Sequence, residues 1–218
     1  MWRNHGLSIV LLSLFLATTA GQAFSGWLDH NESEQQHGNE TSSFGAYLMS
    51  GHFWEATGEN WESEFLQMAA FVLLTTFLYQ KGSAESKRIG VVEEQDLDPR
   101  DFAHLPDAPW PVKRGGFALK LYEHSLGLAF AILFLVSIWI HAWGGLSEYN
   151  NEQISHARQA VTIGEYLRSS RFWFESMQNW QSEFLSLAAM VIGTIFLRQR
   201  HSAESKAVYA GHQETGKA

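Results

Sequence analysis

Two glutamates, Glu64 and Glu183, stand at the same place in a repeated sequence setting. Each comes directly before an apolar run, where an unpaired charge costs several kcal/mol and a carboxylate needs a partner or a proton. His141 is the natural partner, since an imidazole can share a proton near neutral pH. We therefore predict a polar cluster that binds a cation, relays protons or holds a small cationic solute. Its members are Glu64, Glu183, His141, Gln22, Asn60 and Asn179.

Counting along the predicted helices gives the depth of this cluster. If the second membrane helix ends near Gln80, Glu64 stands about 24 Å above the inner boundary. The hydrocarbon core is about 30 Å thick, so Glu64 lies just inside its outer edge. Glu183 occupies the same level on the fourth helix, and Gln22 and His141 do so on the first and third. The asparagines extend the same helical faces outward by one turn.

The glutamates also have a simpler interpretation. At this shallow depth a Glu can reach the lipid headgroups, or bind the backbone N–H groups at a helix start, where negative charge suits the helix dipole. Tryptophans flank them, as expected for an aromatic belt at the interface. The tryptophans assigned to this belt are Trp54, Trp61, Trp173 and Trp180. The alternative is therefore that the glutamates only anchor helix ends.

Four apolar runs provide the elements that must hold these residues, at residues 6–28, 65–79, 126–146 and 184–197. The first and third match the roughly 20 residues of a spanning helix. The second and fourth are shorter and need a turn from the aromatic segments before them, so core helices of a soluble protein are the alternative there. The first run, with its Gly-Gln-Ala at Gly21, also resembles a secretory signal.

An internal duplication with an offset of 119 residues favours a retained first helix. Asn-Trp-x-Ser-Glu-Phe-Leu starts at Asn60 and again at Asn179, and Ser-Ala-Glu-Ser-Lys starts at Ser83 and again at Ser202. Such self-similarity is a strong fold signal. We predict an all-α membrane protein with four transmembrane helices, arranged as two parallel two-helix repeats, with interfacial amphipathic helices on the outer side. The repeats span residues 1–89 and 120–207.

The distribution of Lys and Arg predicts the orientation. Residues 29–63, expected to form an outer loop, contain neither, whereas the segment between the repeats and the C-terminal tail contain many. The positive-inside rule then places both termini, a cytoplasmic linker at residues 90–119 and a tail at residues 208–218 on the cytoplasmic side. The prolines of the linker predict a mostly irregular chain. Gly82 is expected to stop the second helix, and Thr162 with Glu165 to form a capping box.

Composition excludes several functions. The 15 basic and 23 acidic residues give a formal charge of −8, which argues against a nucleic-acid binder. Cysteine is absent, which removes disulfides, thiolate zinc sites and cysteine nucleophiles. The acidic run at residues 29–34 has irregular spacing, so we expect no metal site and no cofactor. No nucleophile elbow, P-loop, zincin helix or dinucleotide fingerprint supports an enzyme.

The chain resembles a family of uncharacterised bacterial membrane proteins, a domain of unknown function. The resemblance rests on the duplicated motifs, on Asp-Ala-Pro-Trp-Pro-Val from Asp107 and on Leu-Tyr-Glu-His from Leu121. It implies a multi-pass protein of the bacterial inner membrane and supplies no activity. Two functions remain open: small-solute or ion handling through the outer-leaflet Glu/His cluster, or a non-catalytic envelope or assembly role. The partners expected are the lipid bilayer and either a second copy or another membrane protein.

Overall fold

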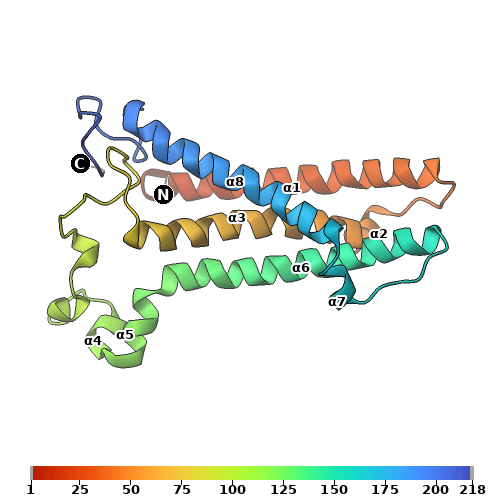
Figure 1. The fold of residues 1–218 in the computed structure, drawn as a ribbon, viewed down its shortest axis with the longest axis horizontal. Coiled ribbons are helices and arrows are strands. Elements are labelled where there is room, and N and C mark those ends of the chain that lie inside the picture. The colour runs from red at the N-terminus through yellow and green to blue at the C-terminus, as the bar shows by residue number, and fades with distance from the viewer. Residues whose placement is uncertain (1, 217–218) are drawn as a thin grey trace. The chain divides into compact units, whose positions relative to one another are not determined.

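The computed structural model describes residues 2–216, and this part of the chain contains helices and no β-strand (Figure 1). The all-α prediction is confirmed. The long helices are α1 (Trp2–Gln36), α3 (Gly51–Phe77), α6 (Ser125–Ser155) and α8 (Ser170–Phe196). The short elements are α2 (Phe44–Tyr47), η1 (Glu94–Asp96), η2 (Pro99–Phe102), α4 (Trp110–Arg114), α5 (Gly116–Glu123) and α7 (Ile163–Tyr166).

Within the described residues, two helices are long and apolar enough to cross a membrane, α1 and α6. Their 35 and 31 residues correspond to about 52 and 46 Å, more than the hydrocarbon core of about 30 Å. Only 6% of the apolar window of α1 and 17% of that of α6 is buried. A core helix of a water-soluble protein buries such residues, so these exposed helices indicate membrane association. The same criterion does not select α3 or α8.

The outer connections are shorter than the sequence analysis predicts. The loop expected at residues 29–63 is reduced to residues 37–50, because α1 continues to Gln36 and α3 already begins at Gly51. Hydropathy locates the part of a helix that suits lipid, whereas Glu and Gln are good helix formers in water. The loop that remains contains the single turn α2, with Ser43 as its N-cap.

The linker and the motif ends also differ from expectation. Residues 90–119 hold η1, η2, α4 and the start of α5, because Pro99 and Pro111 occupy the first turns of η2 and α4, where proline is well tolerated. The helix α3 ends at Phe77, so Gly82 is not its stop. Gly82 instead adopts a positive φ of 85° within a turn, and the Ser-Ala-Glu-Ser-Lys motif follows outside the helix.

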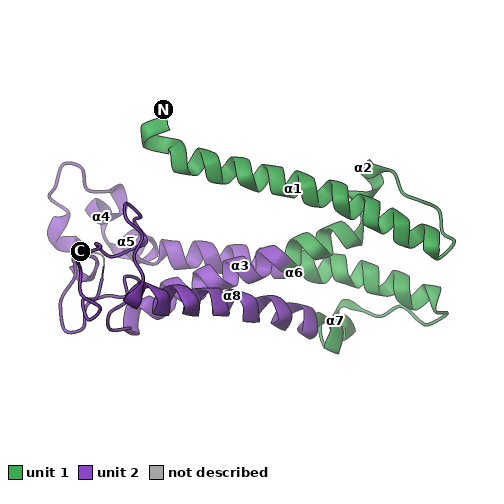
Figure 2. Cartoon of the chain, turned by 90° about the horizontal axis from the view of Figure 1, so that it is seen from above, with its two compact units in different colours: residues 1–59, 139–172 green, residues 60–138, 173–218 purple. Residues whose placement is uncertain are grey.

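The chain divides into two compact units, green and purple in Figure 2. Unit 1 comprises Met1–Glu59 and Trp139–Phe172, and unit 2 comprises Asn60–Ile138 and Trp173–Ala218. In unit 1, Ala23, Tyr47 and Phe53 form a hydrophobic core. A side chain at Gly26 would collide with the Tyr47 hydroxyl, and one at Gly145 with that of Tyr166. Glycine at these positions therefore lets α2 and α7 dock on the long helix that precedes each of them.

Candidate functional site

Several polar side chains are buried while large apolar ones are exposed. The fully buried polar residues include Glu62 and His141, each 0% exposed, and the exposed residues include most of the leucines and phenylalanines of the long helices. A water-soluble core has the opposite distribution. Buried polar groups need hydrogen-bond partners, so each of them fixes how its neighbours pack. We describe these groups unit by unit.

Glu62 forms the most enclosed acidic site of unit 2. Its Oε1 atom accepts a hydrogen bond of 2.8 Å from the indole Nε1 of Trp180 on α8. The Trp180 ring is held edge-on by Phe134 and by Trp173, both with ring centroids at 6.2 Å. A carboxylate in this setting can hold a proton or accept a cation, and an indole can only donate.

One turn before Trp180, the same helix carries a second enclosed polar group. Ser176 is 1% exposed, and its Oγ atom has no hydrogen-bond partner among the described residues. A buried hydroxyl without a partner costs about 1–3 kcal/mol, so a ligand that donates to or accepts from this hydroxyl would lower the free energy of the folded state. Ser176 and Trp180 lie four residues apart and therefore share one face of α8.

Further along unit 2, an amide joins α3 to α8. The Nε2 atom of Gln67 donates to the Ser186 hydroxyl at 2.7 Å and to the backbone carbonyl of Glu183 at 2.9 Å. Gln67 is buried, and Ser186 in turn donates to the Glu183 carbonyl at 2.8 Å. These contacts fix the two helices side by side through backbone and neutral groups.

In unit 1, His141 lies on α6 in a site closed by an aromatic ring. Its imidazole stacks on Phe172, with centroids 4.9 Å apart and an interplanar angle of 25°. A side chain at Gly58 would collide with the His141 backbone, so glycine is required for α3 and α6 to approach here. Gln22 on α1 donates to the hydroxyl of Thr57, the residue before Gly58 on α3, at 3.2 Å.

An ion-pair network in unit 1 involves the buried carboxylate of Glu55. The guanidinium of Arg171 lies 3.8 Å from Glu55 and also binds Glu152 on α6. It stands 5.7 Å from the ring centroid of Tyr149, within the range of a cation–π contact. The buried charge of Glu55 is thus paired with a cation that is itself partly exposed.

A second group of titratable residues lies at the α1–α2–α3 junction of unit 1. The Tyr47 hydroxyl and the Nδ1 atom of His52 are 3.3 Å apart, and the His30 and His52 rings are 5.2 Å apart. Burial, with the neighbouring Asp29 and Glu148 carboxylates, raises the pKa of Tyr47. Burial also lowers the pKa of His52, and Glu148 partly offsets that effect.

The members of the predicted cluster occupy different environments. His141 is buried, Gln22, Asn179 and Glu183 are half-buried, and Asn60 and Glu64 are exposed. Gln22 and His141 belong to unit 1 and the other four to unit 2. Of the predicted belt, Trp173 is exposed, Trp54, Trp61 and Trp180 are half-buried, and the Trp173 and Trp180 rings meet edge to face. The Nδ2 atom of Asn179 binds the Glu175 carbonyl of its own helix.

The sequence analysis did not select Glu62, Gln67 or Ser176. It favoured Glu64 because a glutamate recurs 119 residues later, whereas the counterpart of Glu62 is Gln181. A signal was nevertheless present, because Glu55 and Glu62 are seven residues apart and lie on one face of a helix. Among the described residues, no group of three or more His, Asp or Glu side chains is placed to hold a metal ion.

Comparison with known proteins decides the family. Residues 1–217 match the family described as domain of unknown function (DUF6766). The chain belongs to this family. The match covers almost the whole sequence. No curated protein and no solved structure matches the chain.

Proposed function

We propose that the chain is an integral protein of the bacterial inner membrane in which α1, α3, α6 and α8 all span the bilayer. In this proposal they form two parallel two-helix repeats with both termini and the linker in the cytoplasm. The helix bounds support the two repeats. Helices α7 and α8 begin and end 119 residues after α2 and α3, and α6 ends 119 residues after α1. The lipid bilayer is then the partner that covers the exposed leucines and phenylalanines.

Matched side-chain contacts give further support for the repeats. Asn31 donates to the Ser42 carbonyl at 3.0 Å and accepts from the Ser42 amide at 2.8 Å. Asn150 and Val161, 119 residues later, make the same two bonds at 3.0 and 2.7 Å. An asparagine that binds both backbone groups of one residue is a specific arrangement, and its recurrence favours a common ancestor for the two halves.

Within this architecture, we propose that the protein handles protons or small cations. The observation that carries this is Glu62, a glutamate with no exposed surface inside a bundle whose outer surface is apolar. Ionisable groups within membrane segments face the bundle interior and mark ion or proton pathways. The unpartnered hydroxyl of Ser176, one turn from the indole that binds Glu62, is a further oxygen ligand on the path.

The outer-leaflet cluster of Glu64, Glu183 and His141 remains part of this proposal. Its carboxylates would concentrate cations at the outer end of the path, because acidic groups raise the local cation concentration. The half-buried position of Glu183 and the exposure of Glu64 are compatible with that role.

An envelope or assembly role is the second candidate, and exposed aromatic residues favour it. Trp173 is 44% and Phe174 68% exposed at the start of α8. Large aromatic side chains of this kind are enriched both in binding hot spots and in membrane interfaces. A fixed membrane-protein partner, or a second copy, would cover them.

Flux measurements on the purified full chain in proteoliposomes separate these functions. We expect Glu62→Gln to reduce proton or cation flux by about tenfold or more, because it removes the carboxylate charge of this enclosed site. The matched control is Glu32→Gln, a neutralised glutamate at the exposed end of α1, which should leave flux unchanged. The double variant Glu64→Gln with Glu183→Gln tests the outer cluster separately.

Each result has a defined meaning. Unchanged flux in Glu62→Gln contradicts the proposal that this residue carries the ion, and unchanged flux in the double variant removes the outer cluster from the mechanism. Absence of flux in the unmodified protein, together with crosslinking to one fixed partner in cells, supports the assembly role instead.

A further inference from the structure

Two short helices of unit 2, α4 and α5, form a folded element directly before α6. Figure 1 shows them packed together at the N-terminal end of α6, and we call residues 110–123 the elbow. Gly115 and Gly116 join the two helices with positive φ angles of 67° and 62°, which glycine adopts without strain. Val112 on α4 and Leu119 on α5 are buried. The elbow therefore has an inner face of its own.

The outer face of the elbow is apolar and uncovered. Trp110 is 62%, Phe117 81% and Leu121 51% exposed. Phe117 and Leu121 lie four residues apart and share one face of α5, away from the buried Leu119. Contiguous apolar surface of this kind marks a site of interaction with a protein or a membrane.

Basic side chains surround this apolar face. The elbow contains Lys113, Arg114 and Lys120 against the single acidic residue Glu123, whereas the whole chain has a formal charge of −8. The Arg114 guanidinium stands 4.9 Å from the ring centroid of Trp110. Within residues 2–216, no carboxylate forms an ion pair with these three cations. Their positive charge is therefore available to an external anion.

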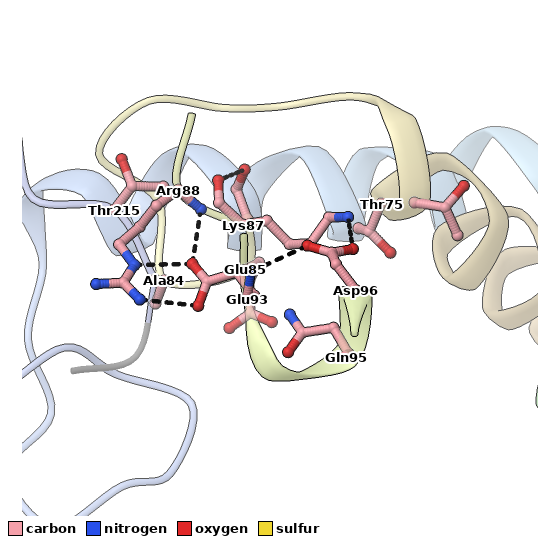
Figure 3. Close-up of a pocket in the computed structure, with 12 residues that line it drawn as sticks. Thr75, Ala84, Glu85, Lys87, Arg88, Glu93, Gln95, Asp96 and Thr215 are labelled. Atoms are coloured by element: carbon pink, nitrogen blue, oxygen red, sulfur yellow. Dashed lines mark hydrogen bonds and ion pairs between the residues drawn. The ribbon is translucent and has the colours of Figure 1, made fainter. Parts of the chain in front are cut away.

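The cations earlier in the linker differ in this respect. They line a cavity of about 700 Å³ beside the first Ser-Ala-Glu-Ser-Lys motif, which Figure 3 shows. There Lys87 donates to Asp96 at 2.7 Å, and Arg88 donates to Glu93 at 2.7 Å. Because these charges are already compensated, the cavity attracts an anion less than the elbow does.

A hollow of about 420 Å³ lies against the elbow, within the size range of small-molecule sites. Its lining combines one guanidinium with apolar surface and contains no carboxylate. A guanidinium suits a phosphate, which accepts several charge-assisted hydrogen bonds, and the apolar lining suits an acyl chain. The lining residues are Arg114, Gly115, Gly116, Phe117, Ala118 and Leu121.

The chain also fixes how far the elbow lies from the hydrocarbon core. The helix α5 ends at Glu123 and α6 begins at Ser125. The apolar run of α6 starts at Leu126, so the end of α5 is at most about 10 Å of chain away from it. The headgroup layer is about 5–8 Å thick on each side of the core. Where α6 spans the bilayer, the elbow therefore lies at the level of the headgroups.

We propose that the elbow lies in the headgroup layer of the cytoplasmic leaflet and binds anionic phospholipid there. Trp110, Phe117 and Leu121 enter the acyl-chain region, and Arg114 and Lys120 contact the phosphates. Aromatic and basic side chains favour this layer. The inference rests on the proposed spanning position of α6 and is independent of ion handling, which assigns no role to the elbow.

The depth of the elbow can be measured with nitroxide labels, because the chain has no cysteine of its own. The full chain carrying Phe117→Cys is labelled in nanodiscs of equal phosphatidylglycerol and phosphatidylcholine. We expect oxygen to reach this label and a water-soluble nickel complex to be excluded from it. Leu135→Cys, at a residue 61% exposed on α6, reports on the spanning helix in the same way.

The two labels separate the failure of this proposal from that of the topology. A label at Phe117 that the nickel complex reaches, with the label at Leu135 shielded, overturns the proposal and leaves α6 in the membrane. Docking of the elbow on another protein gives that same result, since these nanodiscs contain no other membrane protein. Nickel access to both labels overturns the elbow and the spanning α6 together.

The preference for anionic lipid has its own test. Native mass spectrometry of the chain released from these nanodiscs gives the ratio of retained phosphatidylglycerol to phosphatidylcholine. We expect Arg114→Gln with Lys120→Gln to lower this ratio about fivefold or more, since each basic side chain near an anionic surface contributes about fivefold. The control, Arg158→Gln with Arg168→Gln, removes two exposed cations after α6 and should leave the ratio unchanged. Equal ratios for the two double variants overturn the assignment of the phosphates to the elbow.

Discussion

Gln67 on α3 donates a hydrogen bond of 2.7 Å to Ser186 on α8, and these two residues are 119 positions apart. They are equivalent residues of the two sequence copies, so the contact joins a position to its own counterpart. Counterparts meet where a two-fold axis passes between the repeats, as in an isologous interface. The contact therefore supports the proposed relation of the two halves.

Crosslinking can test this contact directly, because the chain has no cysteine of its own. We expect the double variant Gln67→Cys with Ser186→Cys to crosslink within one chain when treated with a short bifunctional thiol reagent. The control pairs Gln67→Cys with Leu185→Cys, since Leu185 is 67% exposed and faces away. Electrophoresis and mass spectrometry read the product. Equal reaction of both pairs, or links only between chains, would contradict the contact.

The helix crossing in unit 1 predicts a stability effect at Gly144. A methyl group there would collide with the Glu55 backbone, which cannot move without displacing α3. We expect Gly144→Ala to lower the free energy of unfolding by about 1–3 kcal/mol, the usual cost of overpacking. Thermal unfolding in detergent measures it.

Gly21 on α1 provides the matched control, because a methyl group there meets no atom within 4 Å. Alanine is also the better helix former, so Gly21→Ala should be neutral or stabilise by up to about 1 kcal/mol. If both variants destabilise equally, close packing at Gly144 is not the cause.

How far the sequence predicts this structure depends on the range of the interaction. The capping box of Thr162 and Glu165 is confirmed, because it involves one turn and its own backbone. Burial of Glu62 was missed, because it depends on the Trp180 side chain, 118 residues away. Hydrogen bonds within one turn can be predicted from neighbouring residues, and a pairing across 118 residues cannot.

The titratable group around His52 predicts a pH effect on stability. His52 is in the first turn of α3, well before the apolar stretch that starts at residue 65. It faces His30 and Asp29 of α1, Tyr47 of α2 and Glu148 of α6. Burial lowers its pKa below 6.5, so the folded state binds fewer protons than the unfolded state. Stability should therefore fall as the pH drops through about 6.5.

The comparison of His52→Gln with His37→Gln tests this assignment. Glutamine cannot be protonated, so His52→Gln should flatten the loss of thermal stability between about pH 7 and 5. His37 is exposed just after the end of α1, and its replacement should leave the profile unchanged. Identical pH profiles for all three proteins would show that another group titrates.

Lys206 holds the C-terminal tail against the first copy of the motif, and its replacement should release that tail. Its Nζ atom donates to the carbonyls of Gly82, Gly211, His212 and Glu214, so Lys206→Met keeps the volume but leaves buried acceptors without a donor. We expect a loss of about 1–3 kcal/mol in unfolding free energy and faster hydrogen exchange across the tail. The equivalent change in the first copy, Lys87→Met, removes a partly exposed ion pair and should leave tail exchange unchanged. Tail exchange that is equally fast in both variants would show that the tail is held by contacts other than this lysine.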